Sequence, residues 1–496
     1  MESIEKYIDE LYQSQNIGAN ENQKNLCPRE FYEQLVTKVL NILKQNKDAS
    51  IKELRKIIYD LSGVEQSIRN FIFERKMAPG AVITYGTKHY QETIVLGNKE
   101  EVISKTGTLQ ENRNPMEQDT IFDLASTTKG FTAIAILKLL EMGLIDNLQD
   151  DITKYAPQFE NLKGITIYDL LTFLPLETKQ RIDSAKSIDE AENMLFTATK
   201  KEISKTANPY NDIAPMVLKY VIEKAAGMDY YSFLKYSILD NLNMNDTLVK
   251  IPEEKKQRVA SGNYDTRYYK DGNIITRDYI TPGISTDDKA RVLGQPEGIL
   301  SGHAGLFSTT DNIEKLARAL IENKILNLDI RREMVKNRTG KMYLKDDGSK
   351  GFVQHLGMLH YSKNPILAAS EVHHPLSGES FASAGWSGTQ LTVDPINEIN
   401  FFMGANRSHN RMTILDPIHR DKIQIDEFGK RTIILPDGKE IIDASSFAID
   451  RPNSPGRDGT IVHPCIELAL QYKILEDIIG KKEEKDLIER TNIHLK

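Results

Sequence analysis

Cysteine, tryptophan and long apolar runs are all scarce in this chain. It holds two cysteines, Cys27 and Cys465, and one tryptophan among 496 residues. Two cysteines are too few for a disulfide framework, and they do not have the spacing of a metal site. No stretch approaches the roughly 18 to 20 apolar residues that a membrane-spanning helix needs. These scarcities argue against a disulfide-rich secreted scaffold and against a helical membrane protein.

An excess of positive charge is also lacking. Lys and Arg number 64 against 71 Asp and Glu, which gives a formal net charge of −7. Such a chain does not attract nucleic acid or anionic lipid through its overall charge. Residues 1–10 are acidic and amphipathic, whereas a secretory signal is basic and then apolar. We therefore expect a cytoplasmic protein without nucleic-acid or membrane partners.

The first 75 residues differ in pattern from the rest. Apolar residues recur there at helical spacing, and Ser50 and Glu53 form a capping box, which satisfies free backbone donors at a helix start. Gly63 is placed to end that helix. We predict a helical N-terminal extension over residues 1–75. It would serve in docking or in assembly of a homo-oligomer, although a purely structural cap fits the sequence equally well.

Residues 76–496 combine strand and helix patterns. Strands are predicted at 81–85, 90–96, 390–393 and 399–403, with a hairpin at 433–435 and 440–442. Helices are predicted at 127–143, 166–173, 187–199, 215–226, 230–242 and 466–479, and an irregular segment at 252–300. Strands first, helices in the middle and strands last predict an α+β fold whose sheet joins both ends of the domain.

Ser126 and Lys129 form a Ser-x-x-Lys pair where an apolar helix is predicted to start. Positions i and i+3 share a helix face, so the amine can lie beside the hydroxyl. Free N–H groups at the helix start favour developing negative charge, and a serine hydroxyl is a poor nucleophile until a base takes its proton. The same pattern at Ser3 and Ser232 falls on a terminal segment and on a polar helix face. On this context alone, a catalytic Ser126 and a helix-capping Ser126 are equally supported.

Several segments resemble one known superfamily. The run 122–146, which contains Ser126-Thr127-Thr128-Lys129, resembles the active-site helix of the serine β-lactamase and penicillin-binding-protein superfamily. The likeness is closest to the class C β-lactamase-like branch, which also holds esterases and D-aminopeptidases. Further similar segments follow in the order that this branch expects: 79–81, 165–172, 210–212, 302–309 and 381–389. Many ordered weak matches are more specific than any one of them, and together they span roughly residues 65–410 and the final helix.

The resemblance implies a fold and a division of the chain. A β-lactamase-like serine hydrolase domain would span residues 76–496. Its fold would be the β-lactamase/transpeptidase-like α+β architecture, an antiparallel sheet flanked by helices. An all-helical subdomain would occupy about residues 145–300.

The resemblance also implies catalytic roles. Ser126 would be the nucleophile, Lys129 its partner on the same helix and Tyr210 a second base. Which of Lys129 and Tyr210 takes the proton is left open. The oxyanion hole would be the backbone N–H groups of Ser126 and Trp386. The implied substrate contacts are Asp212, Ser383, Gly385 and Trp386.

Two departures from the family pattern bear on the substrate. Ser383 stands where relatives carry Lys or His, the basic group that helps hold a substrate carboxylate. Asp212 ends the second motif in place of Asn and brings negative charge to the site. Both changes argue against a dedicated β-lactamase or D-Ala-D-Ala transpeptidase. They favour neutral or cationic acyl donors, unless a basic residue from elsewhere, such as Arg407, replaces the missing group.

Other features predict no separate chemistry. Residues 171–175 read Leu-Thr-Phe-Leu-Pro where relatives commonly carry His-Thr-Ser-Gly after Leu-Thr, which suggests a reshaped wall near the site. His373 and His374 lack a second ligand pair at helical or hairpin spacing, and His303 is interpreted as a structural residue. We predict neither a metal nor a cofactor.

Three functions fit these observations. The favoured one is a serine hydrolase that acts through an acyl-enzyme on a small-molecule acyl substrate, either an ester or a non-standard amide. An acyltransferase would use the same acyl-enzyme and pass the acyl group to an alcohol or amine. A catalytically weak ligand-binding or scaffold protein is the alternative outside enzymes. The combination of Ser126, Lys129 and Tyr210 favours an enzyme.

Overall fold

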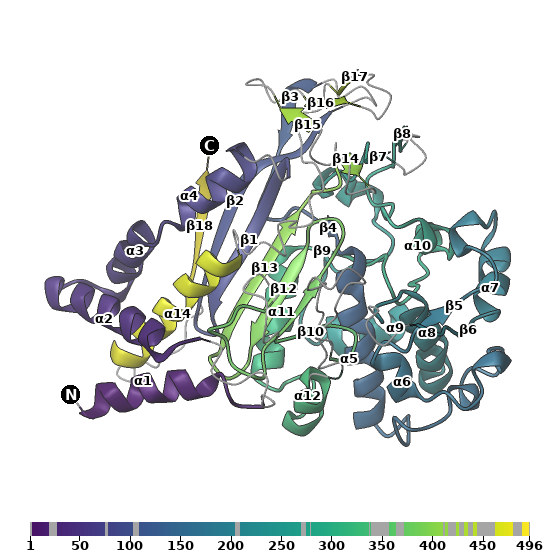
Figure 1. Cartoon of the computed structure of the whole chain (residues 1–496), viewed down its shortest axis with the longest axis horizontal. Coiled ribbons are helices and arrows are strands. Elements are labelled where there is room, and N and C mark those ends of the chain that lie inside the picture. The colour runs from purple at the N-terminus through teal and green to yellow at the C-terminus, as the bar shows by residue number, and fades with distance from the viewer. Residues whose placement is uncertain are drawn as a thin grey trace.

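The computed structural model describes residues 2–18, 27–74, 78–102, 109–203, 209–268, 274–277, 279–336, 338, 357–363, 372–409, 412–414, 423–425, 431–434, 440–443, 462–479 and 489–495 (Figure 1).

One large sheet is built from both ends of the chain. Its strand order is β10-β11-β12-β13-β1-β2-β18, and β3 also pairs with β2. The strands are β1 (Gly80–Thr87), β2 (Tyr90–Val102), β3 (Leu109–Pro115), β10 (Tyr361–Ser362), β11 (Phe381–Ala384), β12 (Gln390–Asp394), β13 (Ile399–Ala405) and β18 (Glu489–Leu495). The pairs are antiparallel except that β18, for which no strand was expected, runs parallel to β2. The predicted α+β fold is confirmed.

The helices before the sheet pack against the last helix. They are α1 (Glu2–Ser14), α2 (Arg29–Gln45), α3 (Ile51–Ser62) and α4 (Val64–Arg69), and α2, α3 and α4 each contact α14 (Val462–Ile479) (Figure 1). The capping box of Ser50 and Glu53 is present, and Gly63 ends α3 with φ of 72°. Both helix-end predictions are confirmed. The role of these helices in docking or assembly stays a prediction.

Further helices gather to one side of the sheet in Figure 1. They are α6 (Ile167–Leu171), α7 (Ile188–Phe196), α8 (Ile213–Ala226), α9 (Tyr230–Leu234) and α10 (Asp288–Val292). Helix α5 (Thr128–Glu141) contacts both α8 and α9, and most of its side chains are buried. A helix that is apolar on all sides belongs in a protein core, so the Ser-x-x-Lys pair starts from a rigid element.

The region expected to be irregular is more ordered than the sequence suggested. It contains α10 and the strands β7 (Thr266–Tyr268) and β8 (Ile274–Thr276), which form a small sheet with β14 (Met412–Ile414). Two short strands, β5 (Leu176–Glu177) and β6 (Thr199–Lys200), also lie among the helices. The predicted hairpin is present as β16 (Arg431–Ile434) and β17 (Glu440–Asp443), with its turn outside the described residues. In the described part of the chain, every helix is too short or too polar to cross a membrane.

A buried ion pair fastens the first helices to the sheet. Arg55 of α3 donates to Glu476 of α14 at 3.1 Å, and their side chains are only 8% and 11% exposed. Thr87, at the end of β1, donates to the same carboxylate at 2.9 Å. The Arg55 guanidinium also lies 3.9 Å from the ring centre of Tyr90. The pair therefore joins α3, α14 and the turn between β1 and β2.

We expect Arg55→Met to lower the free energy of unfolding by about 3 kcal/mol, because it leaves the Glu476 carboxylate buried without its cation. The matched control is Lys56→Met on the same helix, whose exposed pair with Asp60 contributes about 0.5 kcal/mol or less. Urea denaturation of the two variants measures the difference. Equal losses would show that the buried pair does not fasten the helices.

Candidate active site

Ser126 lies on a strained turn between a strand and a helix. Strand β4 (Phe122–Asp123) leads into the turn Ala125–Thr127, after which α5 begins. Ala125 has φ of 45°, a conformation that non-glycine residues rarely adopt. The Asp123 carboxylate accepts a hydrogen bond from the backbone N–H of Ala125 at 2.9 Å and so holds the turn. Ala125 and Thr127 are buried, whereas Ser126 between them is half-buried.

Lys129 faces Ser126 from the next turn of the chain. Its Nζ lies 2.8 Å from Ser126 Oγ, 2.8 Å from Asp212 Oδ1 and 3.3 Å from the carbonyl oxygen of His303. The side chain is 1% exposed. Burial alone would lower the pKa of Lys129, but the negative charge of Asp212 outweighs it and raises that pKa above its usual value. Lys129 is therefore charged in this arrangement and has to lose a proton before it can act as a base.

Tyr210 lies beside the same ammonium. Its ring centre is 4.9 Å from Lys129 Nζ. The ring stacks on Phe173 at 5.0 Å between centres, and Tyr361 of β10 lies parallel to it at 6.4 Å. Phe173 belongs to the segment for which the sequence suggested a reshaped wall. These aromatic contacts fix the direction from which Tyr210 approaches the Ser126–Lys129 pair.

Asp212 stands just before α8 and binds two lysines. Its Oδ1 takes Lys129, and its Oδ2 lies 2.9 Å from Nζ of Lys289 on α10. Burial acts to raise the pKa of this carboxyl, but the positive charges of Lys129 and Lys289 prevail and hold it well below its usual range. Asp212 is therefore ionised, and its charge is shared between two cations.

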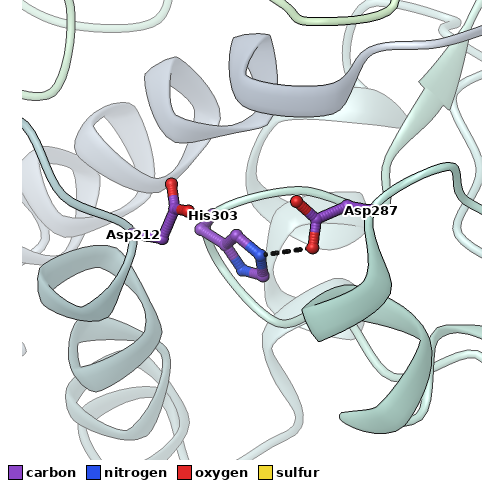
Figure 2. A group of neighbouring side chains, drawn as sticks. All are labelled: Asp212, Asp287 and His303. Carbon is purple, nitrogen blue, oxygen red and sulfur yellow. Dashed lines mark hydrogen bonds and ion pairs between the residues drawn. The ribbon is translucent and has the colours of Figure 1, made fainter. Parts of the chain in front are cut away.

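Asp287 and His303 lie near Asp212, as Figure 2 shows. Asp287 caps α10 by accepting from the backbone N–H of Ala290 at 2.9 Å, and it lies 3.0 Å from His303 Nε2. His303 Nδ1 lies 3.1 Å from Ser301 Oγ. Burial acts to raise the pKa of Asp287, but His303 lowers it more, so the carboxyl is ionised. Both ring nitrogens of His303 therefore have a partner, and its structural role stays a prediction.

Asp212, Asp287 and His303 could in principle hold a metal ion. One ligand atom from each lies within 4.8 Å of the others (Figure 2). However, both oxygens of Asp212 already carry an ammonium, from Lys129 and from Lys289. A metal ion would have to displace or face these two cations. We interpret the group as an ion-pair network.

A second buried carboxylate connects the Ser126 turn to α10. Asp123 Oδ2 accepts from the backbone N–H of Thr286 at 2.7 Å, from Thr286 Oγ1 at 2.8 Å and from Ser285 Oγ at 3.2 Å. Burial raises the pKa of Asp123, although these hydrogen bonds act against that rise. Because Asp123 also holds Ala125, the Ser126 turn and the start of α10 depend on the same side chain.

The end of β11 lies against the Ser126 turn. A Cβ on Gly385 would lie 2.3 Å from both the carbonyl oxygen of Leu124 and Oγ1 of Thr389, so only glycine fits there. Ser387 Oγ donates to the carbonyl of Asp123 at 2.5 Å. The predicted third motif is therefore in contact with the predicted nucleophile turn.

The other residues of this motif differ in exposure. Ser383 is buried, and its Oγ lies 3.5 Å from where a Cβ on Gly130 of α5 would sit. Trp386 is 39% exposed, and the Arg407 guanidinium lies 5.4 Å from its ring centre. Arg407, named from the sequence as a substitute cation, is thus next to the predicted oxyanion-hole residue.

The two other Ser-x-x-Lys patterns look different. Ser3 and Ser232 are exposed, and their lysines form surface pairs, Lys6 with Glu10 at 3.8 Å and Lys235 with Asp240 at 2.9 Å. The sequence reasoning missed Lys289 and Asp287, which lie in the segment expected to be irregular. The available signal was Asp212 itself, since an extra carboxylate beside Lys129 calls for a second cation.

We expect Gly385→Ala to lower the free energy of unfolding by about 1–3 kcal/mol, because its Cβ overlaps backbone that cannot move without shifting the Ser126 turn. Gly130→Ala is the matched control. Its Cβ makes an ordinary contact with Ser383, and alanine is favoured over glycine in a helix by up to about 1 kcal/mol. Urea denaturation measures both variants. A Gly385→Ala protein as stable as Gly130→Ala would contradict the close contact between β11 and the turn.

Comparisons with known proteins place the chain in a family. Residues 71–424 match the family described as Beta-lactamase. A relative from Escherichia coli (strain K12), described as "Putative D-alanyl-D-alanine carboxypeptidase", is 27% identical over 332 residues, 60% of this chain and 71% of the relative.

Solved structures share the fold. The octameric penicillin-binding protein homologue from Pyrococcus abyssi has a TM-score of 0.50 at 21% identity, covering 70% of this chain and 73% of that one. EstCE1, a hydrolase with promiscuous acyltransferase activity, has a TM-score of 0.53 at 17% identity, covering 71% of this chain and 94% of that one. The family and the names of the relatives indicate an enzyme of the serine hydrolase or peptidase type. Since the family match spans most of the sequence, the chain belongs to the Beta-lactamase family.

Proposed function

We propose that the protein is a serine hydrolase that forms an acyl-enzyme on Ser126 and acts on a small ester or a non-standard amide. The observation that carries this proposal is the 2.8 Å contact between Lys129 Nζ and Ser126 Oγ at a half-buried serine. Hydrogen-bond contact between a nucleophile and its base is the geometry that serine acyl transfer needs. The packing of β11 against the Ser126 turn supports the same assignment.

The steps assign a role to each group. Neutral Lys129, or Tyr210 if it acts as a phenolate, takes the Ser126 proton as Oγ attacks the substrate carbonyl. The backbone N–H groups of Ser126 and Trp386 bind the resulting oxyanion, which forms in a site where fixed donors act strongly. The proton then passes to the leaving alcohol or amine as its bond to the acyl carbon breaks. Water attacks the acyl-enzyme and releases the acid, with the same groups accepting and returning a proton.

The proposed substrate carries no carboxylate next to the acyl centre. Ser383 offers a neutral hydroxyl where relatives offer a cation, and a charge-assisted hydrogen bond contributes about 1.5–3 kcal/mol against about 1 for a neutral one. Asp212 was also expected to repel anions. Its charge is balanced by Lys129 and Lys289, so Ser383 is the stronger part of this argument.

A fluorophosphonate probe tests the nucleophile. We expect one covalent adduct per chain in wild type and none in Ser126→Ala, as read by intact-mass spectrometry. Ser232→Ala removes the serine of an exposed Ser-x-x-Lys pattern and should label like wild type. An unlabelled wild-type protein would favour the ligand-binding alternative, and equal labelling of Ser126→Ala would place the nucleophile elsewhere.

Substrate charge is tested with two p-nitrophenyl esters that differ only in a terminal carboxylate. We expect the neutral ester to have the higher kcat/KM by about tenfold, because placing a carboxylate beside buried, neutral Ser383 removes it from water without a cation, and a tenfold difference corresponds to about 1.4 kcal/mol. Adding a primary alcohol to the same assay reveals acyl transfer as a new ester product. A higher kcat/KM for the carboxylated ester would contradict the argument from Ser383.

A further inference from the structure

Two ammonium groups share one carboxylate next to Ser126. Lys129 from α5 takes Asp212 Oδ1 at 2.8 Å, and Lys289 from α10 takes Oδ2 at 2.9 Å. Lys129 is buried, whereas the Lys289 side chain is 32% exposed. The superfamily resemblance implies a neutral Asn at this position, where the present chain carries the charge of Asp212.

An ionised Asp212 creates a problem for a base at Lys129. The amine has to be neutral to accept the Ser126 proton, and then the carboxylate loses one of its cations. A partly buried carboxylate left without a cation is strongly unfavourable. With Asp212 alone, Lys129 would therefore be held in its charged and inactive form.

Lys289 supplies the missing compensation. We propose that Lys289 is a positioning residue that keeps Asp212 paired while Lys129 is neutral, and so allows Lys129 to serve as the base for Ser126. The inference rests on the proposed function of Ser126. During a cycle one proton moves from Ser126 Oγ to Lys129 Nζ and leaves with the departing group, while Lys289 stays charged throughout.

The groups around Lys129 leave this role to Lys289. Apart from Asp212, the Lys129 ammonium contacts Ser126 Oγ, the Tyr210 ring and the backbone carbonyl of His303. None of these three groups is a cation that could pair with Asp212 Oδ2. Among the other titratable neighbours, Asp287 and His303 contact each other at 3.0 Å, and the carboxylates of Asp287 and Asp183 also attract the Lys289 ammonium.

The position of Lys289 is also fixed. Asp287 caps α10, and Thr286 is held by Asp123, which holds the Ser126 turn as well. Lys289 therefore keeps its place relative to Ser126. Its ammonium lowers the affinity of Lys129 for a proton, because it offsets part of the Asp212 charge that holds that proton.

Competitive acetylation with acetic anhydride at pH 8 tests the coupling without requiring turnover. Because Lys129 is buried, its acetylation depends on access as well as on its neutral fraction, so each variant is compared with wild type after peptide mass spectrometry normalises Lys129 to exposed Lys56. We expect Lys289→Met to reduce Lys129 acetylation at least about tenfold, one pKa unit. Lys289→Arg keeps the charge and should restore most of it. Unchanged acetylation in Lys289→Met would overturn the proposal.

The Asp212→Asn background separates coupling from general damage. Without the Asp212 carboxylate, the two lysines no longer share a negative charge. Adding Lys289→Met to Asp212→Asn should therefore change Lys129 acetylation less than about twofold, well within a single pKa unit. An equal effect in both backgrounds would show that Lys289 acts on the fold and would also overturn the proposal.

The rate of fluorophosphonate labelling against pH links the coupling to Ser126. In Lys289→Met the rise of labelling with pH should shift upward by at least about one unit, with Lys289→Arg close to wild type. If wild type is not labelled at Ser126, the proposed function fails, while the acetylation result still decides whether Lys289 controls the proton on Lys129. A labelling profile that does not shift, together with shifted acetylation, would refute Lys129 as the base.

Discussion

The site depends on one carboxylate held between two ammonium groups. Asp212 stands at the start of α8 and binds Lys129 of α5 and Lys289 of α10, so a single side chain brings three helices together. A charge removed from water has to be compensated where it lies. Because Asp212 is ionised, the positions of both lysines are constrained, and so is the approach of Tyr210 and His303 to the Lys129 ammonium.

A second carboxylate supports the same geometry from the other side of Ser126. Asp123 fixes the strained Ala125 turn and also receives Thr286 at the start of α10. The nucleophile turn and the segment that leads into α10 are therefore both held by Asp123. This arrangement explains how Lys289, from a helix of only five residues, can take part in the site. The charges around Ser126 therefore depend on how the Ser126 turn and α10 are held together, and not on one flexible side chain.

The parts of the structure that could be predicted from the sequence are local ones. The pairing of Ser126 with Lys129 follows from helix geometry alone, and the capping box at Ser50 involves residues three apart. Lys289 could not be placed in this way. It lies far from Lys129 in the chain, and its helix is too short for an apolar period to show.

Strand pairing and aromatic contacts were hidden for a similar reason. Strand β18 joins the sheet parallel to β2, and nothing in its own residues specifies that partner. The stacking of Phe173 on Tyr210 likewise depends on tertiary packing. The substitution of Asp for Asn at position 212 was visible, but its consequence required knowing which cation lies opposite.

A crystal structure of the phosphonylated protein tests the account most directly. It should show phosphorus bonded to Ser126 Oγ, a phosphonyl oxygen between the backbone N–H groups of Ser126 and Trp386, and Asp212 still bound by Lys289. An adduct on another residue, or a phosphonyl oxygen directed away from both N–H groups, would contradict it.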